Sequence, residues 1–258
     1  SNFEGGPSAL SAGITGRTPR YGFHLPQQRL ATLHVRVEDT PATLNEWGAL
    51  GGVIGRIAGN YWAVPVIEGI EGAPGSDALK HFGAAMASFG SIALFHLVGL
   101  TPEASRLADV APDVKSLPSQ RVSRADFTAL QQSYHSTDEV DVVVFSAPQL
   151  SLLELRDIAA LCDGRNFKKP LIAITSPQIK PDSDHMGFTQ TIEDAGGQVL
   201  SGMCFYQSYA REMADAHGWK RLATNSAKLV NILGGYGYQP MLGSMEACVE
   251  AAATGRLV

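Results

Sequence analysis

Several features that commonly indicate a function are missing from this sequence. It contains only three cysteines, Cys162, Cys204 and Cys248, and no pair of them has Cys-x-x-Cys spacing. No lysine or arginine cluster is present and the net charge is −5, which argues against nucleic acid or an anionic membrane surface as the main partner. The longest mostly apolar runs, 92–97 and 140–145, have the length of a strand, so no transmembrane segment is expected.

The cysteine count and the first residues bear on the setting of the chain. An odd number of cysteines without a secretory signal predicts reduced thiols and a cytoplasmic location. Each cysteine is then a core residue, a metal ligand or a nucleophile, and a small buried hydrophobe is the commonest of the three. Ser1 is not preceded by an initiator methionine and leads directly into patterned sequence, so we expect a piece of a longer polypeptide.

The sequence alternates between short apolar runs and longer helical stretches. Runs such as 63–67, 140–145 and 171–174 predict strands, and the stretches of about 10–15 residues between them predict helices. This alternation is typical of parallel sheets that helices cover on both faces. The sequence therefore predicts an α/β protein with mostly parallel sheets.

Two further patterns concern the organisation of the chain. The segment 112–122 contains two prolines with serines and a lysine, and it predicts a linker between two α/β subdomains, residues 1–115 and 116–258. The predicted helix 42–60 contains five glycines, which cost helix stability. They indicate either a close packing partner or a break in the helix, and they do not form a phosphate loop because no Gly-Lys-Ser/Thr follows.

Polar side chains follow the predicted strands of the second half. The segments 146–149, 175–177, 202–204 and 224–228 each come at the carboxyl end of a strand. Such ends meet at one edge of a parallel sheet, and ligands bind in the crevice outside that edge. The sequence therefore predicts one polar crevice, to which the stretch 197–255 contributes a thiol, hydroxyls and a lysine.

Asn225, Ser226 and Lys228 suit an anionic substrate. A helix start offers free backbone amides and the positive end of the helix dipole, and a lysine one turn further adds a charge. The alternative is a simple helix cap, in which Thr224 or Asn225 accepts a hydrogen bond from the backbone. The sequence leaves both interpretations open.

The remaining candidates are two cysteines and a histidine. Cys204 follows a strand and can present its sulfur to a cofactor, whereas Cys162, near the end of a predicted helix, is expected to be structural. Cys248 lies on the predicted helix 244–253, on the same face as Ser244. His24 lies in a loop rich in proline and glycine, where it is a ligand, an acid–base group or a surface residue.

Five segments, in their order and spacing, resemble the large catalytic portion of aconitase X. The resemblance covers essentially all 258 residues, and no single segment is diagnostic. The segments are 1–7 (SNFEGGP), 15–25 (TGRTPRYGFHL), 93–104 (ALFHLVGLTPEA), 224–228 (TNSAK) and 248–252 (CVEAA).

This resemblance implies an aconitase-like three-layer α/β fold and the activity of a carbon–oxygen lyase. Members of the family remove water from cis-3-hydroxy-L-proline in one branch and from mevalonate 5-phosphate in another, with an iron–sulfur cluster as Lewis acid. A base takes a proton beside the carboxylate while iron helps the hydroxyl to leave. The resemblance implies that Cys204 ligates iron, with Cys248 as a second-rank ligand candidate. It implies that Ser226 and Lys228 act on or hold the substrate carboxylate. Asn2, His24 and Asn225 are implied to bind the substrate near the pocket.

Two departures from the family pattern matter. Family members often carry a Gly-Cys-Pro-His-like turn where residues 146–149 read Ser-Ala-Pro-Gln, so a complete three-cysteine set is not expected and a two-iron, two-sulfur cluster is favoured. The family also has an amino-terminal portion with another cysteine and a small swivelling domain. Neither is in this sequence, and both are expected as partners of the chain in the same enzyme.

The missing thiol and the run 206–212 resemble the hydroxyproline branch more than the other, so cis-3-hydroxy-L-proline is the expected substrate. Two alternatives remain. A lyase of the mevalonate 5-phosphate dehydratase type should need more cationic residues than the surroundings of Thr224 offer. A non-catalytic α/β ligand-binding or assembly subunit is the other alternative.

Overall fold

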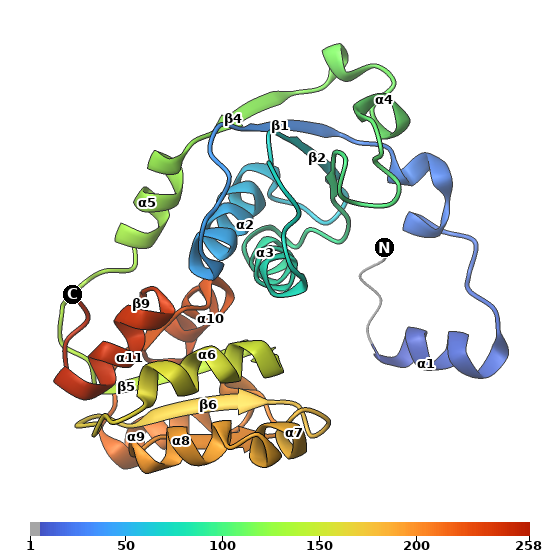
Figure 1. The fold of residues 1–258 in the computed structure, drawn as a ribbon. Coiled ribbons are helices and arrows are strands. Elements are labelled where there is room, and N and C mark those ends of the chain that lie inside the picture. The colour runs from blue at the N-terminus through green and yellow to red at the C-terminus, as the bar shows by residue number, and fades with distance from the viewer. Residues whose placement is uncertain (1–5) are drawn as a thin grey trace.

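A computed structural model describes residues 6–258, which form two α/β domains and an amino-terminal arm (Figure 1). The arm and first domain contain α1 (Gly6–Thr15), η1 (Gly22–His24), η2 (Pro26–Arg29), β1 (Leu33–Val37), α2 (Leu44–Ala58), β2 (Pro65–Glu68), α3 (Ser76–Gly90), β3 (His96–Leu97), α4 (Leu107–Val110), η3 (Val114–Ser116), β4 (Ser119–Val122) and α5 (Arg124–Gln132). The second domain contains β5 (Val142–Leu150), α6 (Leu152–Cys162), β6 (Leu171–Thr175), α7 (Lys180–His185), α8 (Phe188–Asp194), β7 (Gln198–Ser201), η4 (Phe205–Gln207), α9 (Ala210–His217), β8 (Arg221–Thr224), α10 (Ala227–Leu233), η5 (Gly234–Tyr236), β9 (Gln239–Leu242) and α11 (Met245–Thr254).

The first domain is built on a four-stranded parallel sheet in the order β3-β2-β1-β4. Helices α2, α3 and α5 cover one face, where Val35 of the sheet packs with Leu50 and Phe82 of the helices. The other face is smaller and packs Val66 against Val110 of α4. In β1, Leu33, His34, Val35 and Val37 are buried and Arg36 is exposed.

The second domain contains a five-stranded parallel sheet in the order β7-β6-β5-β8-β9. Side chains alternate between its faces, as expected for a strand. Val143 and Phe145 of β5 pack against α6, α8 and α11, whereas Val142 and Val144 pack against η4, α9 and α10. Both sheets are parallel and covered by helices, which confirms the α/β class.

Glycines allow α2 and α3 to approach closely. A Cβ atom on Gly51 would lie 2.2 Å from the carbonyl oxygen of Phe82, and one on Gly90 would lie 2.1 Å from the carbonyl oxygen of Gly55. Such distances are far shorter than any van der Waals contact, so only glycine fits at this helix contact. Of the two interpretations of the glycine-rich segment, the structure supports close packing.

The boundary between the domains differs from the one predicted at residues 115 and 116. β4 pairs with β1, and α5 packs on α2, so both belong to the first domain. The chain passes to the second sheet only between 133 and 141. No apolar strand pattern is present here, because β4 is an edge strand whose residues 119–121 are polar and exposed.

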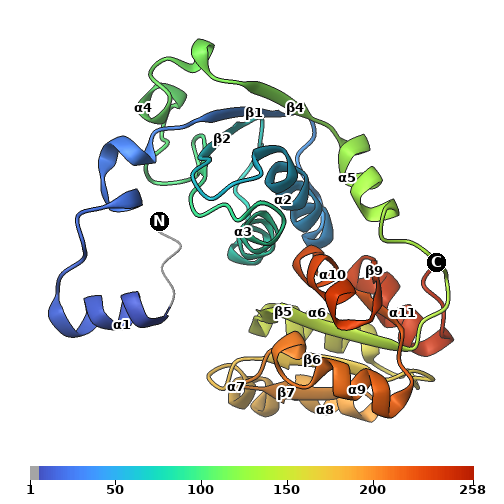
Figure 2. The same cartoon turned by 180° about the vertical axis from the view of Figure 1, so that it is seen from behind.

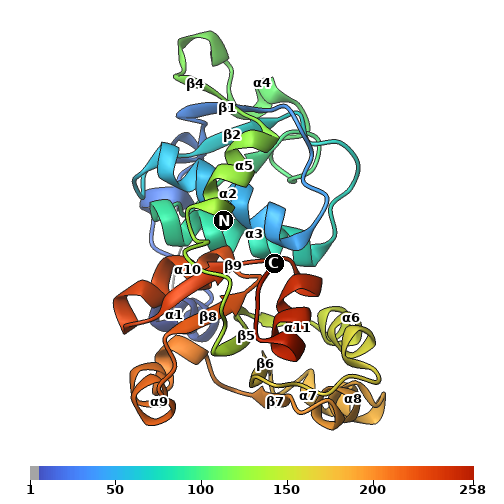
Figure 3. The same ribbon diagram turned by 90° about the vertical axis from the view of Figure 1, so that its left-hand side faces the viewer.

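The two domains meet where α10 packs against α2 and α3 (Figure 3). Ala227 and Val230 of α10 form a small apolar cluster with Ala85 of α3, and Asn231 Nδ2 donates a hydrogen bond to the carbonyl oxygen of Ser88 at 3.1 Å. Helix α1 stands away from both domains, and none of its residues is buried (Figures 1 and 2). Within residues 6–258, no helix combines the length and the apolarity that a membrane crossing requires.

Candidate functional site: the carboxyl edge of the second sheet

The irregular carboxyl-terminal part of β5, residues 146–149, contacts the segments that follow β7 and β8. Ser146 Oγ accepts a hydrogen bond from the amide of Phe205 at 3.4 Å, and Gln149 Nε2 donates to the carbonyl oxygen of Met203 at 3.0 Å. On the other side, Ser226 Oγ donates to the carbonyl oxygen of Ala147 at 2.6 Å. The predicted meeting of segments 146–149, 202–204 and 224–228 at one edge of the sheet is therefore confirmed.

A cavity of about 600 Å³ lies between this edge and the first domain. The first domain contributes the first turns of α2 and α3, including Asn45 and Ala78. The second domain contributes Asp157 of α6, Asn225 and Glu246 in the first turn of α11. Three helices thus begin at this interdomain cleft, where their free amides and dipoles favour an anionic group.

Among the predicted site residues within 6–258, Asn225 lines the interdomain cleft. Its side chain is 2% exposed, and within residues 6–258 its Nδ2 is the buried side-chain nitrogen that has no hydrogen-bond partner. A buried amide without a partner costs about 1–3 kcal/mol, so such a group points to a role outside the folding of the domain. A ligand oxygen would satisfy it.

Ser226 is fully engaged inside the protein. Its hydroxyl donates to Ala147, and it also accepts a hydrogen bond from the amide of Leu229 at 3.1 Å as the N-cap of α10. Its residue is 1% exposed. The cap interpretation therefore applies at Ser226, one or two residues later than the cap predicted at Thr224 or Asn225, and the structure gives Ser226 a positioning role instead of a free hydroxyl.

Lys228 and Cys204 lie near one another on the side of α10 that faces η4. Lys228 Nζ is 5.9 Å from the ring centroid of Tyr206, and both Lys228 and Cys204 are half-buried. Burial raises the pKa of Tyr206, and the neighbouring Cys204 thiol contributes in the same direction. The structure therefore brings these two predicted site residues together through Tyr206, in a group distinct from Asn225 and the cleft lining.

A buried ionic cluster joins the two domains beside this edge. Glu154 of α6 is 2% exposed, and its carboxylate accepts hydrogen bonds from His81 Nε2 at 2.8 Å and from Lys80 Nζ. Lys80 also lies 3.0 Å from Asp77 Oδ1, and Ser151 Oγ donates to Asp77 Oδ2 at 2.7 Å. The cluster of Asp77, Lys80, His81, Ser151 and Glu154 holds α3 of the first domain against the start of α6.

Sequence reasoning missed this cluster, although part of it has a sequence signal. Ser151 and Glu154 have the Ser-x-x-Glu spacing of a capping box, and the structure shows both of its hydrogen bonds. That spacing predicts where α6 begins. It does not predict that Glu154 is buried, because the burial comes from α3, which is about 70 residues away in the sequence.

The cluster predicts a loss of stability in acid. Burial by itself would raise the pKa of Glu154, but His81 and Lys80 outweigh it and hold the pKa at about 2, below the ordinary value of 4.5. A carboxyl group with a lowered folded-state pKa stabilises the protein above its ordinary pKa, and this stabilisation disappears as the pH falls from about 5 towards 2. We expect a loss of about 2 kcal/mol by pH 3, measured by urea unfolding at pH 7 and pH 3.

The matched variant for this measurement is Glu154→Gln, which keeps the shape of the side chain and removes its titration. Its unfolding free energy should change less between pH 7 and pH 3 than that of the unmodified protein. An equal change in both proteins would assign the acid sensitivity to other carboxyl groups.

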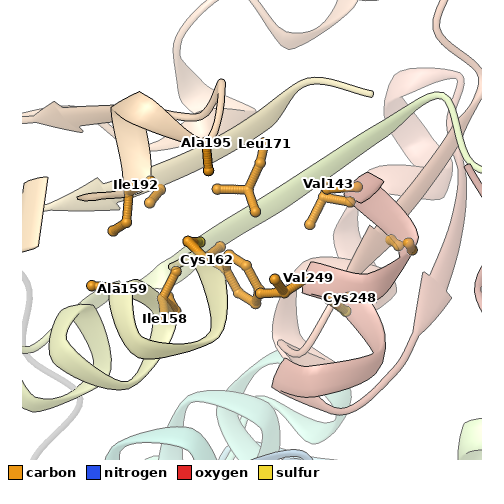
Figure 4. Packing of buried hydrophobic residues seen from close by; sticks show 14 of the residues in the cluster. Val143, Ile158, Ala159, Cys162, Leu171, Ile192, Ala195, Cys248 and Val249 are labelled. Atoms are coloured by element: carbon orange, nitrogen blue, oxygen red, sulfur yellow. The ribbon is translucent and has the colours of Figure 1, made fainter. Parts of the chain in front are cut away.

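The other two cysteines lie in the core of the second domain (Figure 4). Cys162 and Cys248 are both 0% exposed, and burial raises the pKa of each thiol, that of Cys162 to about 12. The expectation that Cys162 is structural agrees with this packing. Cys248, predicted as a second-rank metal ligand, packs with Val249 among the same apolar side chains, so the fold does not bring it to the cleft or to Cys204.

His24 lies in η1, where its ring packs edge-on against Tyr21. The neighbouring Phe23 packs with Val64 and Leu94, next to the amino ends of the strands of the first sheet. The interdomain cleft is at the opposite, carboxyl ends, so the structure separates His24 from Asn225. The predicted site residue Asn2 lies outside the described residues.

The residues described by the structure do not make a metal centre by themselves. Within residues 6–258, no group of three or more histidine, cysteine, aspartate or glutamate side chains is arranged to hold a metal ion. Cys204 is the one cysteine of the three that is not fully buried. The chain therefore offers one accessible thiolate at most, which does not fit a complete iron–sulfur cluster.

Comparison with known proteins places both domains in one family. The family description "Aconitase X second domain" matches residues 31–132, and "Aconitase X third domain" matches residues 140–254. The chain belongs to the aconitase X family. These two matches also separate the aconitase X domains where the structure does, between 133 and 139.

Individual aconitase X relatives agree with this assignment. The phosphomevalonate dehydratase large subunit of Methanothermobacter thermautotrophicus is 38% identical over 91% of this chain and 56% of its own length. The cis-3-hydroxy-L-proline dehydratase of Pseudomonas aeruginosa is 31% identical over 96% of this chain and 43% of its own length. A crystal structure of Thermococcus kodakaraensis aconitase X in its holo-form matches 97% of this chain and 62% of that chain, with 33% identity and a TM-score of 0.84. The aconitase-like fold is therefore confirmed, and the chain spans between two fifths and two thirds of the length of these relatives.

Proposed function

We propose that the chain is the catalytic core of a hydro-lyase that removes water from a small hydroxy acid at the carboxyl edge of the second sheet. The observation that carries the proposal is that both domains belong to aconitase X, whose relatives reported above are named as dehydratases. The interdomain cleft supports it, since it is large enough for a small acid and carries groups that favour an anion.

Within this proposal, Asn225 orients the substrate carboxylate. Its Nδ2 lacks a partner in the fold, and the first turns of α2, α3 and α11 surround the same cavity. An amide that donates to a carboxylate contributes about 1.5–3 kcal/mol. Ser226 holds Asn225 in place by capping α10 and binding the turn at Ala147.

Cys204 and Lys228 form the second part of the proposed site. Cys204 is the thiol that can ligate a metal, with the remaining ligands supplied by protein outside residues 6–258. Lys228 adds a positive charge on the same side of α10, next to Tyr206. The missing amino-terminal portion and a small domain or subunit complete this arrangement, and a relative named as a "large subunit" supports the expectation of a partner.

Two substrates are candidates. Within the described residues, the cavity lining contains the carboxylates of Asp157 and Glu246 and no lysine or arginine, which favours a substrate without phosphate such as cis-3-hydroxy-L-proline. The higher identity to the phosphomevalonate dehydratase large subunit, 38% against 31%, favours mevalonate 5-phosphate. Turnover of each compound by the full-length enzyme with its partner subunit or domain distinguishes them, and no turnover of either would leave a non-catalytic ligand-binding subunit.

Asn225→Leu tests the assigned role of this residue. We expect kcat/KM to fall about tenfold to a hundredfold, because the hydrogen bond to the carboxylate is lost. The melting temperature should stay unchanged or rise, since the variant removes a buried amide that has no partner in the fold. Both are measured on the full-length enzyme.

The matched control is Asn166→Leu, at an exposed asparagine before β6. It should leave kcat/KM unchanged. An Asn225→Leu enzyme with the original kcat/KM would remove Asn225 from substrate binding, and one with a greatly lowered melting temperature would make it a structural residue.

A further inference from the structure

The buried ionic cluster is connected to the Cys204 segment by a short series of hydrogen bonds. Glu154 accepts from Lys80 Nζ, and the same Nζ donates to the carbonyl oxygen of Gln149 at 3.0 Å. The side chain of Gln149 then donates through Nε2 to the carbonyl oxygen of Met203 at 3.0 Å. Met203 is the residue directly before Cys204, so the series runs from α3 of the first domain to the half-exposed thiol.

The first part of this series is rigid, and the last part is not. Glu154 and His81 are 2% and 3% exposed, so the carboxylate that fixes Lys80 has no room for another arrangement. Gln149 is exposed and lies in the irregular carboxyl-terminal part of β5. The position of the Met203 carbonyl oxygen is thereby tied to a fixed point in the interface between the domains.

The Cys204 segment is anchored on both sides, by the amide of Gly202, which donates to the carbonyl oxygen of Thr175 at 3.2 Å, and by Phe205, which is buried in the core of the second domain. Residues 202 and 203 belong to no helix or strand, and the amide of Phe205 makes a long hydrogen bond of 3.4 Å to Ser146 Oγ. Segments with few buried contacts and few short hydrogen bonds open easily. The bond from Gln149 to Met203 therefore acts on the short stretch, Met203 and Cys204, that lies between these two anchors.

We propose that Lys80 is a positioning residue, which transmits the docking of the first domain to the Cys204 segment through Gln149. Its importance for catalysis rests on the proposed function, in which Cys204 belongs to the reacting site. The coupling between Lys80 and the Cys204 segment does not rest on the proposed function, because it concerns only the position of this segment. Lys80 contacts Asp77, Glu154 and Gln149, and it is not among the residues that line the interdomain cleft.

Two variants interrupt the series at different points. Lys80→Met removes the ammonium group and keeps a long apolar stem, so it breaks the bond to the Gln149 carbonyl oxygen. Gln149→Ala leaves the ionic cluster intact and removes only the bond to Met203. Lys115→Met and Gln132→Ala are the matched controls, because both residues are exposed and Gln132 lies at the end of α5.

The measurement is hydrogen exchange of the 202–206 amides in the full-length enzyme, together with the rate of alkylation of Cys204 by iodoacetamide after any bound metal has been removed with a chelator, read by peptide mass spectrometry. Both variants should raise the two rates about fivefold to tenfold, the effect expected for loss of one hydrogen bond. The double variant should resemble the single variants, since both interrupt the same series. Both controls should retain the original rates.

A purely structural role for Lys80 gives a different pattern. Lys80→Met would then lower the unfolding free energy, while the alkylation and exchange rates of folded Lys80→Met and Gln149→Ala remained unchanged, and that result would overturn the proposal. The readouts need no substrate. A failure of the dehydration assay therefore refutes the proposed function without touching this coupling, and unchanged rates refute the coupling without touching the proposed function.

Discussion

Glu154→Ala is expected to lower the free energy of unfolding by about 3–5 kcal/mol, one of the two largest effects that we predict for a single substitution. The carboxylate is 2% exposed and is shared by His81 and Lys80. Its removal leaves the buried imidazole of His81 without its carboxylate partner and takes from Lys80 one of its two carboxylates, so that only Asp77 remains. The substitution also removes half of the capping box at Ser151.

The measurement is urea unfolding at pH 7, followed by circular dichroism. Glu250→Ala is the matched control, because Glu250 also forms an ion pair, with Arg165 at 2.5 Å, but is 53% exposed. Exposed ion pairs contribute about 0–1 kcal/mol, so the control should be nearly neutral. Similar losses in the two variants would mean that burial does not strengthen the Glu154 cluster.

Gly51→Ala is the other substitution with a large expected effect, a loss of about 3 kcal/mol or more in unfolding free energy. The added methyl group would lie 2.2 Å from the carbonyl oxygen of Phe82 and 3.2 Å from Cβ of Ala85. The obstacle is backbone, so a side chain cannot rotate away and α2 must separate from α3. Separation exposes part of the apolar core between these helices.

Gly83→Ala provides the opposite control in the same pair of helices. Its added Cβ would meet the Phe95 ring at 3.5 Å, an ordinary contact. Alanine is favoured over glycine in a helix by about 0.5–1 kcal/mol, so this variant should be slightly more stable. Thermal unfolding of both variants tests this difference. Equal destabilisation by Gly51→Ala and Gly83→Ala would show that the close approach of α2 and α3 is not the cause of the loss at Gly51.

The class of the fold and the edge that carries the polar turns were predictable from the sequence. Both depend on local patterns, namely apolar runs of strand length and small polar residues after them, at 146–149 and 224–228. β4 was not predictable, because its polar residues pair as an edge strand with β1 without an apolar pattern of their own.

The candidate site was predictable only in part. The local sequence shows that Asn225, Ser226 and Lys228 lie at the start of a helix. In the structure they have three different roles: Asn225 lines the cleft, Ser226 caps α10 and Lys228 lies near Tyr206. These roles depend on which neighbour each face of α10 contacts. The burial of Glu154 could not be predicted, since it depends on contacts with α3 across the domain interface. Contacts of this kind leave no periodic signal in the sequence.

The strand order of the second sheet determines which of its turns can control specificity. From β5 the chain continues to β6 and β7 on one side, whereas β8 and β9 lie on the other, so the sheet reverses its winding between β5 and β8. Helices α6 and α10 leave these two strands on opposite faces. At such a topological switch point the two loops diverge and leave a gap that the sheet cannot close. Under the proposed function, substitutions at the exposed Gln149 and at Asn225, which lines the cleft, should therefore change substrate preference while the architecture stays the same.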